Sequence, residues 1–368
     1  MQNRHFKVWP PGRPHHLEPL ETSVYQNLEV TAQRSPQTPA IIYYDTVITY
    51  AELLADVRRL AGYLAGHAGI KTDDRAVLYL QNSPQFVIGY YAILAANAVV
   101  VPVNPMNRTE ELRHIADDAG ARLIIAGQDV AEQAEPLVGN SAVGQLIRVR
   151  YCDYVREATE LELPAVVTEP HRRPSGAIAT AWADAMATGS QPPAHTRRPD
   201  DWCTIPYSSG TTGAPKGCLH THRSTNAIVR AYASWVGALA GSRVLGTLPL
   251  FHVTGMQNSM HAPIFAGASV VLMTRWHRDT AARLIERYRI AHWRSITTMA
   301  IDFVSHPEIG RYDLSSMATL GGGGAQMPAA VAARLKALTG LDYVEAYGLT
   351  ETMAPTHINP PQAAKPQC

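Results

Sequence analysis

The chain has 368 residues, of which 46% are hydrophobic and 17% are charged, with 32 Lys and Arg against 31 Asp and Glu. This length accommodates about two domains, and the low charged fraction excludes a long disordered tract. The formal net charge of +1 gives no overall field for attracting nucleic acid or an anionic membrane, so an anionic ligand must be held by a local site.

The cysteines and the N-terminal residues favour a cytoplasmic protein. The cysteines are Cys152, Cys203, Cys218 and Cys368. They lack metal-ligand spacing and the density of a secreted scaffold, and the first residues contain no apolar core of a secretory signal. Residues 76–107 carry no charged side chain, but Pro84 and Pro102 interrupt them. We therefore expect a buried helix followed by a buried strand there, and no transmembrane segment.

Short apolar runs alternate with amphipathic helices from about residue 40. Thr49 and Glu52 have the spacing of a capping box, and the helix that follows has one apolar face as far as Leu64. The next expected elements are a strand at 76–80, a helix at 85–96, a strand at 99–103, a helix from 109 and a strand at 123–126. Residues 152–201 show weak periodicity, which predicts connecting loops and short helices.

The alternation resumes at residue 204. Expected strands lie at 204–207, 244–248, 269–273, 293–297 and 318–320, with helices between them. The best-marked helix begins at Pro328 and ends at Leu338, before Gly340. This order predicts an α/β fold with parallel sheets and crossover helices. We place a first α/β subdomain with an N-terminal arm at 1–200 and a second at 201–368, and we expect the proline-rich residues 355–368 to be a connection.

A loop rich in hydroxyls and glycines follows the strand at 204–207. Its sequence is YSSGTTGAPKG, and its candidate phosphate ligands are Ser208, Ser209, Gly210, Thr211, Thr212, Gly213 and Lys216. Backbone amides, hydroxyls and one ammonium group suit a polyphosphate. A P-loop NTPase is excluded because Pro215 precedes the lysine and Gly217 follows it, where that motif needs Gly and then Ser or Thr.

Three further sequence motifs are weak evidence for a ligand-binding site when each is taken alone, and stronger evidence when they are taken together. LPLFHVTG at 248–255 places His252 just past a strand end, where open parallel sheets bind ligands. GGGGAQMP at 321–328 offers bare backbone to a flat ring, and YGLTE at 347–351 offers an aromatic face, a hydroxyl and a carboxylate. An isolated histidine is more often structural than catalytic, and His220 and His222 have no clear third metal ligand, so we expect them to be structural.

In this order and spacing, the four strings resemble the adenylate-forming (ANL) superfamily, and most closely its acyl-CoA synthetases, from about Glu21 to the last residue. The resemblance implies that a carboxylate attacks the α-phosphorus of ATP, releasing pyrophosphate, and that coenzyme A then displaces AMP. It implies a large domain with two sheets in αβαβα layers. The expected ligands are ATP, Mg²⁺, coenzyme A and a carboxylic acid, with no nucleic acid, and a homodimer is an open alternative.

The resemblance also assigns roles to residues. The loop at 208–216 would hold the β- and γ-phosphates, Thr350 would contact the α-phosphate and Glu351 would bind Mg²⁺. The catalytic groups would be Lys216, His252, Thr350 and Glu351, with His252 at the acyl carboxylate. Gly324, Ala325 and Gln326 would line one face of the adenine and Tyr347 would cover the other, and Gly348 would also belong to the nucleotide site. Val253, Met256, Met299, Gly322 and Gly323 would line the acyl tunnel.

Relatives of this kind also have parts that no residue here matches: a ribose-binding Asp, a complete terminal β-barrel, and a small C-terminal domain with a catalytic lysine. We therefore expect the chain alone to keep the phosphate loop and the acyl tunnel but to have little or no ligase activity. Because the expected tunnel residues are apolar, with no basic residue among them, a fatty or medium-chain acid is favoured and an aryl acid is the alternative. Two other functions stay open: an adenylation domain that loads a carrier protein, and a nucleotide- or acyl-binding module without catalysis.

Overall fold

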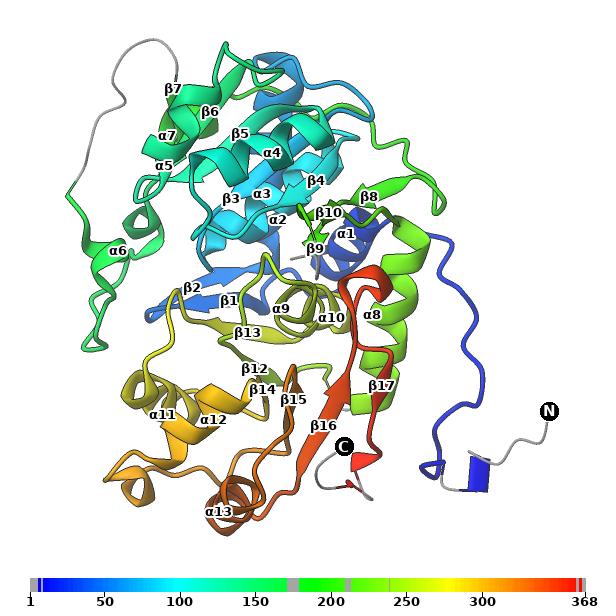
Figure 1. Cartoon of the computed structure of the whole chain (residues 1–368), viewed down its shortest axis with the longest axis vertical. Helices are drawn as coiled ribbons and strands as arrows, with labels where there is room; N and C mark the ends of the chain where they lie inside the picture. Colours follow the sequence, from blue (N-terminus) through cyan, green and yellow to red (C-terminus); the bar gives the residue numbers. More distant parts are fainter. Residues whose placement is uncertain are drawn as a thin grey trace.

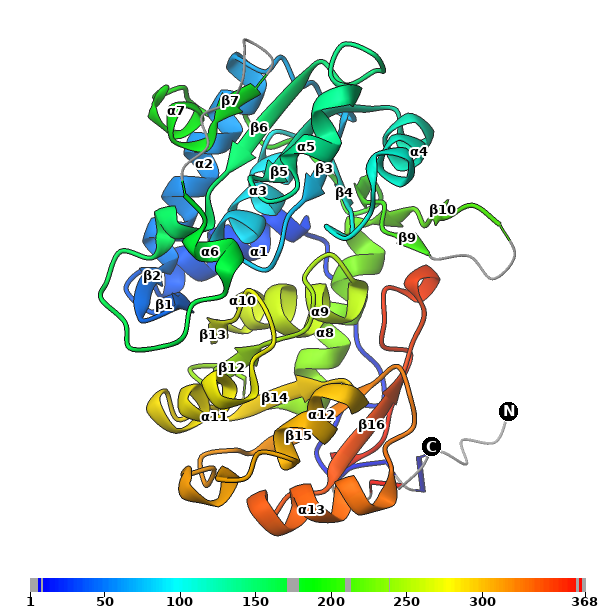
Figure 2. The same ribbon diagram turned by 60° about the vertical axis from the view of Figure 1, so that its left-hand side comes forward.

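A computed structural model describes residues 6–7, 9–170, 179–208, 213–237, 239–361 and 364–365. Within these ranges, two large sheets are stacked with helices between them and outside them (Figure 1, Figure 2). We call them sheet A, in the lower part of Figure 1, and sheet B, in the upper part.

Sheet B has the strand order β11-β8-β4-β3-β5-β6-β7. Its strands are β3 (Arg75–Tyr79), β4 (Val99–Pro102), β5 (Ala121–Gly127), β6 (Gln145–Val149), β7 (Ala179–Ala181), β8 (Trp202–Thr204) and β11 (His220–Thr221). Neighbouring strands are parallel except for β11 and β8. The parallel pairing fits strands that are covered on both faces by helices.

Sheet A has the strand order β17-β16-β15-β14-β12-β13-β1-β2. Its strands are β1 (Pro39–Tyr43), β2 (Thr46–Thr49), β12 (Arg243–Gly246), β13 (Ser269–Leu272), β14 (His292–Ser295), β15 (Thr319–Gly323), β16 (Tyr343–Tyr347) and β17 (His357–Ile358). The edge strands β2 and β17 are antiparallel to their neighbours and the other pairs are parallel.

Helices form three layers around these sheets. The α-helices are α1 (Val24–Arg34), α2 (Tyr50–Gly66), α3 (Pro84–Ala95), α4 (Thr109–Ala119), α5 (Ala131–Ala134), α6 (Ala165–Thr168), α7 (Trp182–Ala187), α8 (His222–Val236), α9 (Val253–Met256), α10 (Ala262–Ala266), α11 (Arg278–Arg287), α12 (Thr297–Val304) and α13 (Ala329–Thr339). A π-helical turn, η4 (Gln257–His261), joins α9 to α10, and short 3₁₀ turns are η2 (Glu135–Leu137), η3 (Tyr151–Tyr154), η5 (Ile309–Arg311) and η6 (Thr350–Thr352). Helices α4 and α5 cover the outer face of sheet B, while α11 to α13 lie on the outer side of sheet A. The predicted αβαβα layering is confirmed.

The side chains of β3 show why sheet B needs a helix layer on each face. Val77 and Tyr79 pack with Leu112 and Ile115 of α4, whereas Ala76 and Leu78 belong to the larger core on the other face. Successive side chains of a strand point to opposite faces. A strand that is apolar at every position is therefore stable only between two apolar layers.

Residues 76–103 of the uncharged stretch at 76–107 lie in the interior of the protein, whereas Met106 is exposed. It forms β3, α3 and β4, and every residue of α3 is buried. Across the described ranges, no helix combines the length and the apolar character that a membrane span requires. The expected buried helix followed by a buried strand is confirmed.

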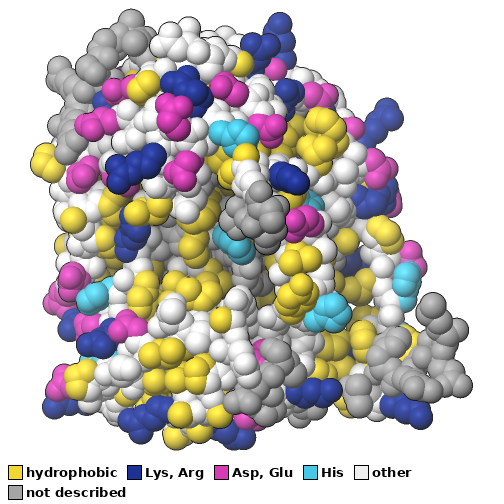
Figure 3. Space-filling model, viewed as in Figure 1, with side chains coloured by type: hydrophobic (Ala, Val, Ile, Leu, Met, Phe, Trp, Pro, Cys, Tyr) yellow, Lys and Arg dark blue, Asp and Glu magenta, His cyan; other side chains and the backbone are white. Residues whose placement is uncertain are grey.

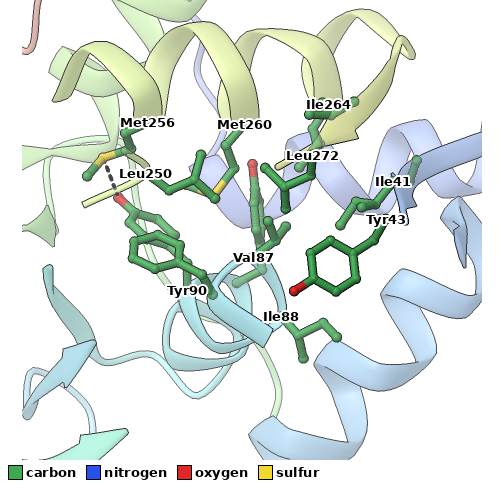
Figure 4. Packing of buried hydrophobic residues seen from close by; sticks show 14 of the residues in the cluster. Ile41, Tyr43, Val87, Ile88, Tyr90, Leu250, Met256, Met260, Ile264 and Leu272 are labelled. Atoms are coloured by element: carbon green, nitrogen blue, oxygen red, sulfur yellow. Dashed lines mark hydrogen bonds between the residues drawn. The ribbon is translucent and has the colours of Figure 1, made fainter. Parts of the chain in front are cut away.

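The central core joins the two sheets. Side chains of α9, η4 and α10 face α3 and the strands of sheet A (Figure 4). The labelled members are Ile41, Tyr43, Val87, Ile88, Tyr90, Leu250, Met256, Met260, Ile264 and Leu272. Because this core is continuous, the relative position of the sheets is fixed by packing rather than by a linker.

The expected boundary at residue 200 does not separate the strands of the two sheets. Sheet A includes two strands from before residue 200, and sheet B includes two strands from after it. The hairpin β1–β2 pairs with β13 in sheet A, where Ile41 is in register with Val270, and β8 and β11 belong to sheet B. The strand expected at 204–207 is divided into β8 and a separate β9 (Tyr207–Ser208). Pro206 lies between them, and proline has no N–H for the ladder.

Two core histidines give the fold a pH dependence. His222 Nδ1 accepts the N–H of Val24 at 3.1 Å, and His261 Nδ1 lies 2.9 Å from the Tyr91 hydroxyl. The Nε2 atom of each ring is buried without a hydrogen-bond partner in the described part of the chain. Burial lowers the pKa of each imidazole to about 3, because the interior disfavours the charged ring.

We predict that the free energy of unfolding falls as the pH is lowered from 6.5 to 5. The unfolded chain binds these protons near the ordinary histidine pKa of about 6.5, whereas the folded chain does not, so each ring contributes up to about 1.4 kcal/mol per pH unit. Urea unfolding at pH 8, 6.5 and 5 measures this slope. H222Q should flatten it, and the exposed control H67A should not. An equal stability at pH 6.5 and 5 would contradict the prediction.

Candidate functional site

The hydroxyl- and glycine-rich loop connects two short antiparallel strands. β9 pairs with β10 (Lys216–Gly217), so that Lys216 is opposite Ser208. Gly213 and Lys216 are exposed, and the predicted ligands from Ser209 to Thr212 lie outside the described residues. A Cβ atom on Gly217 would lie 2.8 Å from Ile205 Cγ2 and 3.1 Å from the ring of Tyr207. Glycine therefore lets the loop return against sheet B.

Helix α4 holds this hairpin from one side. His114 Nε2 lies 3.1 Å from the carbonyl oxygen of Pro215. The hydroxyl of Tyr207 donates to the carboxylate of Asp118. These contacts fix the base of the hairpin relative to sheet B.

The hairpin and η6 share a cavity of about 330 Å³. The cavity is lined by Ser208 and Pro215 of the loop, by Thr350, and by His252 with Val253. Figure 3 shows a hollow across the middle of this face, with hydrophobic side chains on its walls. The structure thus brings together the ends of the phosphate loop, the histidine of the second string and the threonine of the last string.

Glu351 follows Thr350 and is exposed. In the described ranges its carboxylate forms no salt bridge, and its charge helps to raise the pKa of Cys218, for which burial is the larger cause. One carboxylate beside a hydroxyl fits Mg²⁺, because this ion keeps several water ligands and takes others from phosphate oxygens. The residues present therefore suit the implied metal.

His252 lies at the junction of two cavities. It lines the cavity beside the hairpin and a second one of about 170 Å³. Its Nδ1 atom accepts the N–H of Thr254 at 3.2 Å, and burial lowers its pKa. The ring is therefore neutral near pH 7 and carries its proton on Nε2, which is a hydrogen-bond donor and not a cation.

Asn82 positions the segment that carries His252. Its side-chain amide donates to the carbonyl of Leu248 at 3.0 Å and accepts the N–H of Leu250 at 2.8 Å. Asn82 is buried and follows β3 of sheet B. Our sequence analysis did not identify Asn82 as a site residue. The signal that could have identified it is that Asn82 is a polar residue within the otherwise largely apolar stretch at 76–107.

The second cavity lies over the carboxyl ends of β15 and β16. Its lining residues are Tyr232, His252, Thr254, Asn258, Arg294, Gly322, Gly323, Gly324, Ala346, Tyr347, Gly348, Ala354, Pro355 and Ile358. Tyr347 has 59% of its surface exposed. The predicted tunnel glycines and part of the predicted adenine site thus border one space.

The remaining predicted residues lie elsewhere. Ala325 and Gln326 are exposed, and their carbonyls accept from the Thr297 hydroxyl. Met256 is buried against Tyr90 (Figure 4). Met299 is partly buried against the core. None of these four lines either of the two cavities.

His220 joins the strand after the loop to η6. It is buried on β11, and its Nε2–H donates to the carbonyl of Thr350 at 2.8 Å. Burial lowers its pKa, so the ring is neutral. His222 instead binds the amide of Val24. In the described residues, no group of three or more His, Cys, Asp or Glu side chains could hold a metal ion.

We predict that H220A weakens the binding of ATP with Mg²⁺ by about two- to tenfold, because one neutral hydrogen bond contributes about 0.5–1.5 kcal/mol and here it positions Thr350. Isothermal titration calorimetry measures the change, with the exposed H67A variant as the control. An ATP affinity equal to that of the unaltered chain would show that His220 does not position η6.

Comparison with known proteins identifies the class. The family model described as "AMP-binding enzyme" matches residues 28–368, and the chain belongs to this family. The long-chain-fatty-acid–CoA ligase of Bacillus subtilis is 30% identical over 359 residues, covering 95% of this chain and 64% of that protein. The feruloyl-CoA synthase of Amycolatopsis is 31% identical, covering 87% of this chain and 58% of that protein. The chain therefore spans less than two thirds of these two relatives.

Solved structures show the same fold. The anthranilate CoA ligase AuaEII, solved with anthranoyl-AMP, matches with a TM-score of 0.83 at 22% identity, covering 95% of this chain and 64% of that one. The N-terminal domain of FACL13 from Mycobacterium tuberculosis matches with a TM-score of 0.80 at 24% identity, covering 95% of this chain and 83% of that one.

Proposed function

We propose that this chain binds ATP and a carboxylic acid and takes part in forming an acyl-adenylate, which coenzyme A then converts to a thioester. The observation that carries the proposal is the position of His252 between the two cavities. One cavity borders the phosphate loop and Thr350, and the other is lined by glycines of β15 and by both apolar and polar side chains. An acid bound near His252 in the second cavity would meet a nucleotide whose phosphates lie beside the first cavity and whose adenine lies against Gly324 and Tyr347.

The proposed chemistry uses the following groups. A carboxylate oxygen attacks the α-phosphorus of ATP, and the bond to the β-phosphate oxygen breaks, releasing pyrophosphate. Lys216 and the loop hydroxyls stabilise the charge on the departing phosphates, while Thr350 and the Nε2–H of His252 donate to oxygens near the reacting atoms. Glu351 would hold Mg²⁺, which supplies additional charge neutralisation. The coenzyme A sulfur then attacks the acyl carbon, and AMP leaves.

Acid-dependent exchange between ATP and labelled pyrophosphate tests this proposal. We would assay a panel of aliphatic and aryl acids, because the relatives named above include long-chain fatty acid and feruloyl ligases. Mass spectrometry of thioesters after adding coenzyme A would separate a CoA ligase from an enzyme that loads a carrier protein. No ATP binding and no exchange with any acid would contradict the proposal.

A further inference from the structure

Arg294 is a buried cation in the wall of the second cavity. It lies on β14, is 4% exposed and lines the cavity together with Tyr232 and the glycines of β15. Its guanidinium forms no salt bridge in the part of the chain that the structure describes. The tunnel residues expected from sequence included no basic side chain, and Arg294 was not among them. Arg294 precedes Met299, which was expected to line the tunnel, and only the strand pairing brings Arg294 to the cavity.

The neighbouring strand leaves room for this guanidinium. Arg294 is in register with Gly321 of β15, and a Cβ atom on Gly321 would lie 2.2 Å from Nη1 of Arg294. The guanidinium thus occupies the space where a side chain of β15 would be. Any larger residue at 321 would displace it.

Tyr232 of α8 holds the guanidinium from the other side. The Nε–H of Arg294 donates to the Tyr232 hydroxyl at 3.0 Å, and the Arg294 Cζ atom lies 5.8 Å from the centre of the ring. Both contacts are to a neutral residue. The charge of the guanidinium is therefore oriented but not neutralised.

A buried charge without a counter-ion is costly, and buried arginines are ordinarily paired with an anion. A carboxylate in the cavity would receive charge-assisted hydrogen bonds from the free donors of the guanidinium, which can bind two oxygens in parallel. The cavity has no such group of its own, because its described lining includes no Asp or Glu. A carboxylate of a bound ligand would supply the anion that the described lining lacks.

The size of the cavity limits the body of the ligand. Its volume is about 170 Å³, close to that of the engineered cavity of about 150 Å³ that binds benzene in another protein. Ala346, Pro355 and Ile358 supply apolar surface around this space. A ring or a short chain fits such a volume better than a long alkyl chain.

Resting on the proposed function above, we propose that the substrate is a compact carboxylic acid with a second carboxylate, which Arg294 binds while the reacting carboxylate lies at His252. A benzene ring between two carboxylates has the required size and charge. Arg294 acts here as a specificity-determining residue, and the fatty or medium-chain acid favoured by sequence is replaced by a polar-ended acid.

The test uses three inhibitors with the same 5′-sulfamoyladenosine group and different acyl groups: 4-carboxybenzoyl, benzoyl and decanoyl. Isothermal titration calorimetry with this chain should show the 4-carboxybenzoyl compound binding at least about tenfold more tightly than the benzoyl compound, as expected for hydrogen bonds to a charged group. Equal or weaker binding of the 4-carboxybenzoyl compound would overturn the inference. If none of the three compounds binds, the proposed function itself fails, so the two failures are distinguishable.

Variants connect the preference to the residue. R294M should abolish the preference for the 4-carboxybenzoyl compound over the benzoyl compound, whereas the control R334M, at an exposed position on α13, should keep this preference. Y232F retains the charge but removes the acceptor of the Nε–H, so it should reduce the preference only in part. A preference that survives in folded R294M would contradict the assignment. If R294M does not fold, the relative affinities of the three compounds for the unaltered chain still test the proposal.

Discussion

K216A should weaken the binding of ATP by at least about tenfold and slow any acid-dependent pyrophosphate exchange by about 100- to 1000-fold. Lys216 is exposed on β10, where it is opposite Ser208, and Ser208 lines the cavity that also contains Thr350. Its ammonium is the positive charge that the loop offers to a triphosphate. Removing it leaves the phosphate charge to neutral donors, which contribute less.

Titration with ATP and Mg²⁺ measures the affinity even where exchange is slow. K71A is the matched control, because Lys71 is also exposed but lies outside the hydroxyl- and glycine-rich loop. E351Q should lose affinity in the presence of Mg²⁺ but not in EDTA, which would separate a metal ligand from a phosphate ligand. Unchanged ATP affinity in K216A would exclude Lys216 from the phosphate site.

The second large effect concerns stability and the wall of the second cavity. G322A should lower the free energy of unfolding by about 1–3 kcal/mol or more, as expected for overpacking at a site that cannot expand. A Cβ atom on Gly322 would lie 1.8 Å from the carbonyl oxygen of Ser295 and 2.4 Å from the hydroxyl of Tyr343. Two strands would have to separate, because the closest contact is backbone.

Urea unfolding at pH 7.5 measures this loss, with G310A as the matched control. A Cβ atom on Gly310 would have no other atom within 4 Å, and the backbone φ of Gly310 is not in the left-handed region. Its replacement by alanine should therefore change the free energy of unfolding by no more than about 0.5 kcal/mol. A G322A variant as stable as G310A would show that β14 and β15 can move apart, and would remove the argument that glycine is required here.

Local sequence signals predicted where two helices begin or end. Thr49 and Glu52 form the expected capping box of α2, with the N–H of Glu52 donating to the Thr49 hydroxyl and the Glu52 carboxylate accepting the N–H of Thr49. Gly340 ends α13 in the left-handed conformation, with a φ of +74°. Such signals depend only on residues a few positions apart, and so they can be read from one sequence.

These local signals could not predict which segments that are far apart in the sequence pair with one another. Nothing local in Pro39–Thr49 shows that this hairpin joins β13, more than two hundred residues later in the chain. The same applies to Asn82, which acts on the backbone around Pro249, and to His220, which holds Thr350. Polar residues of this kind become interpretable only when the fold brings their partners to them.

In the candidate site, too, some features could be predicted from local sequence and others depended on long-range strand pairing. The motifs predicted which segments meet, and the shared cavities at His252 agree with that prediction. They did not predict the positive charge in the wall of the second cavity, because Arg294 reaches this cavity only through the glycine opposite it on β15. A sequence without an alignment gives no register between β14 and β15, and the register decides which side chains line the wall.

A crystal structure of this chain with Mg²⁺ and α,β-methylene-ATP, an analogue that cannot release pyrophosphate, tests the central claim most directly. The account predicts the phosphates between the β9–β10 hairpin and η6, the α-phosphate near Thr350 and His252, and the adenine against Gly324 and Tyr347. A nucleotide bound at another place, or no bound nucleotide at millimolar concentrations, would contradict it.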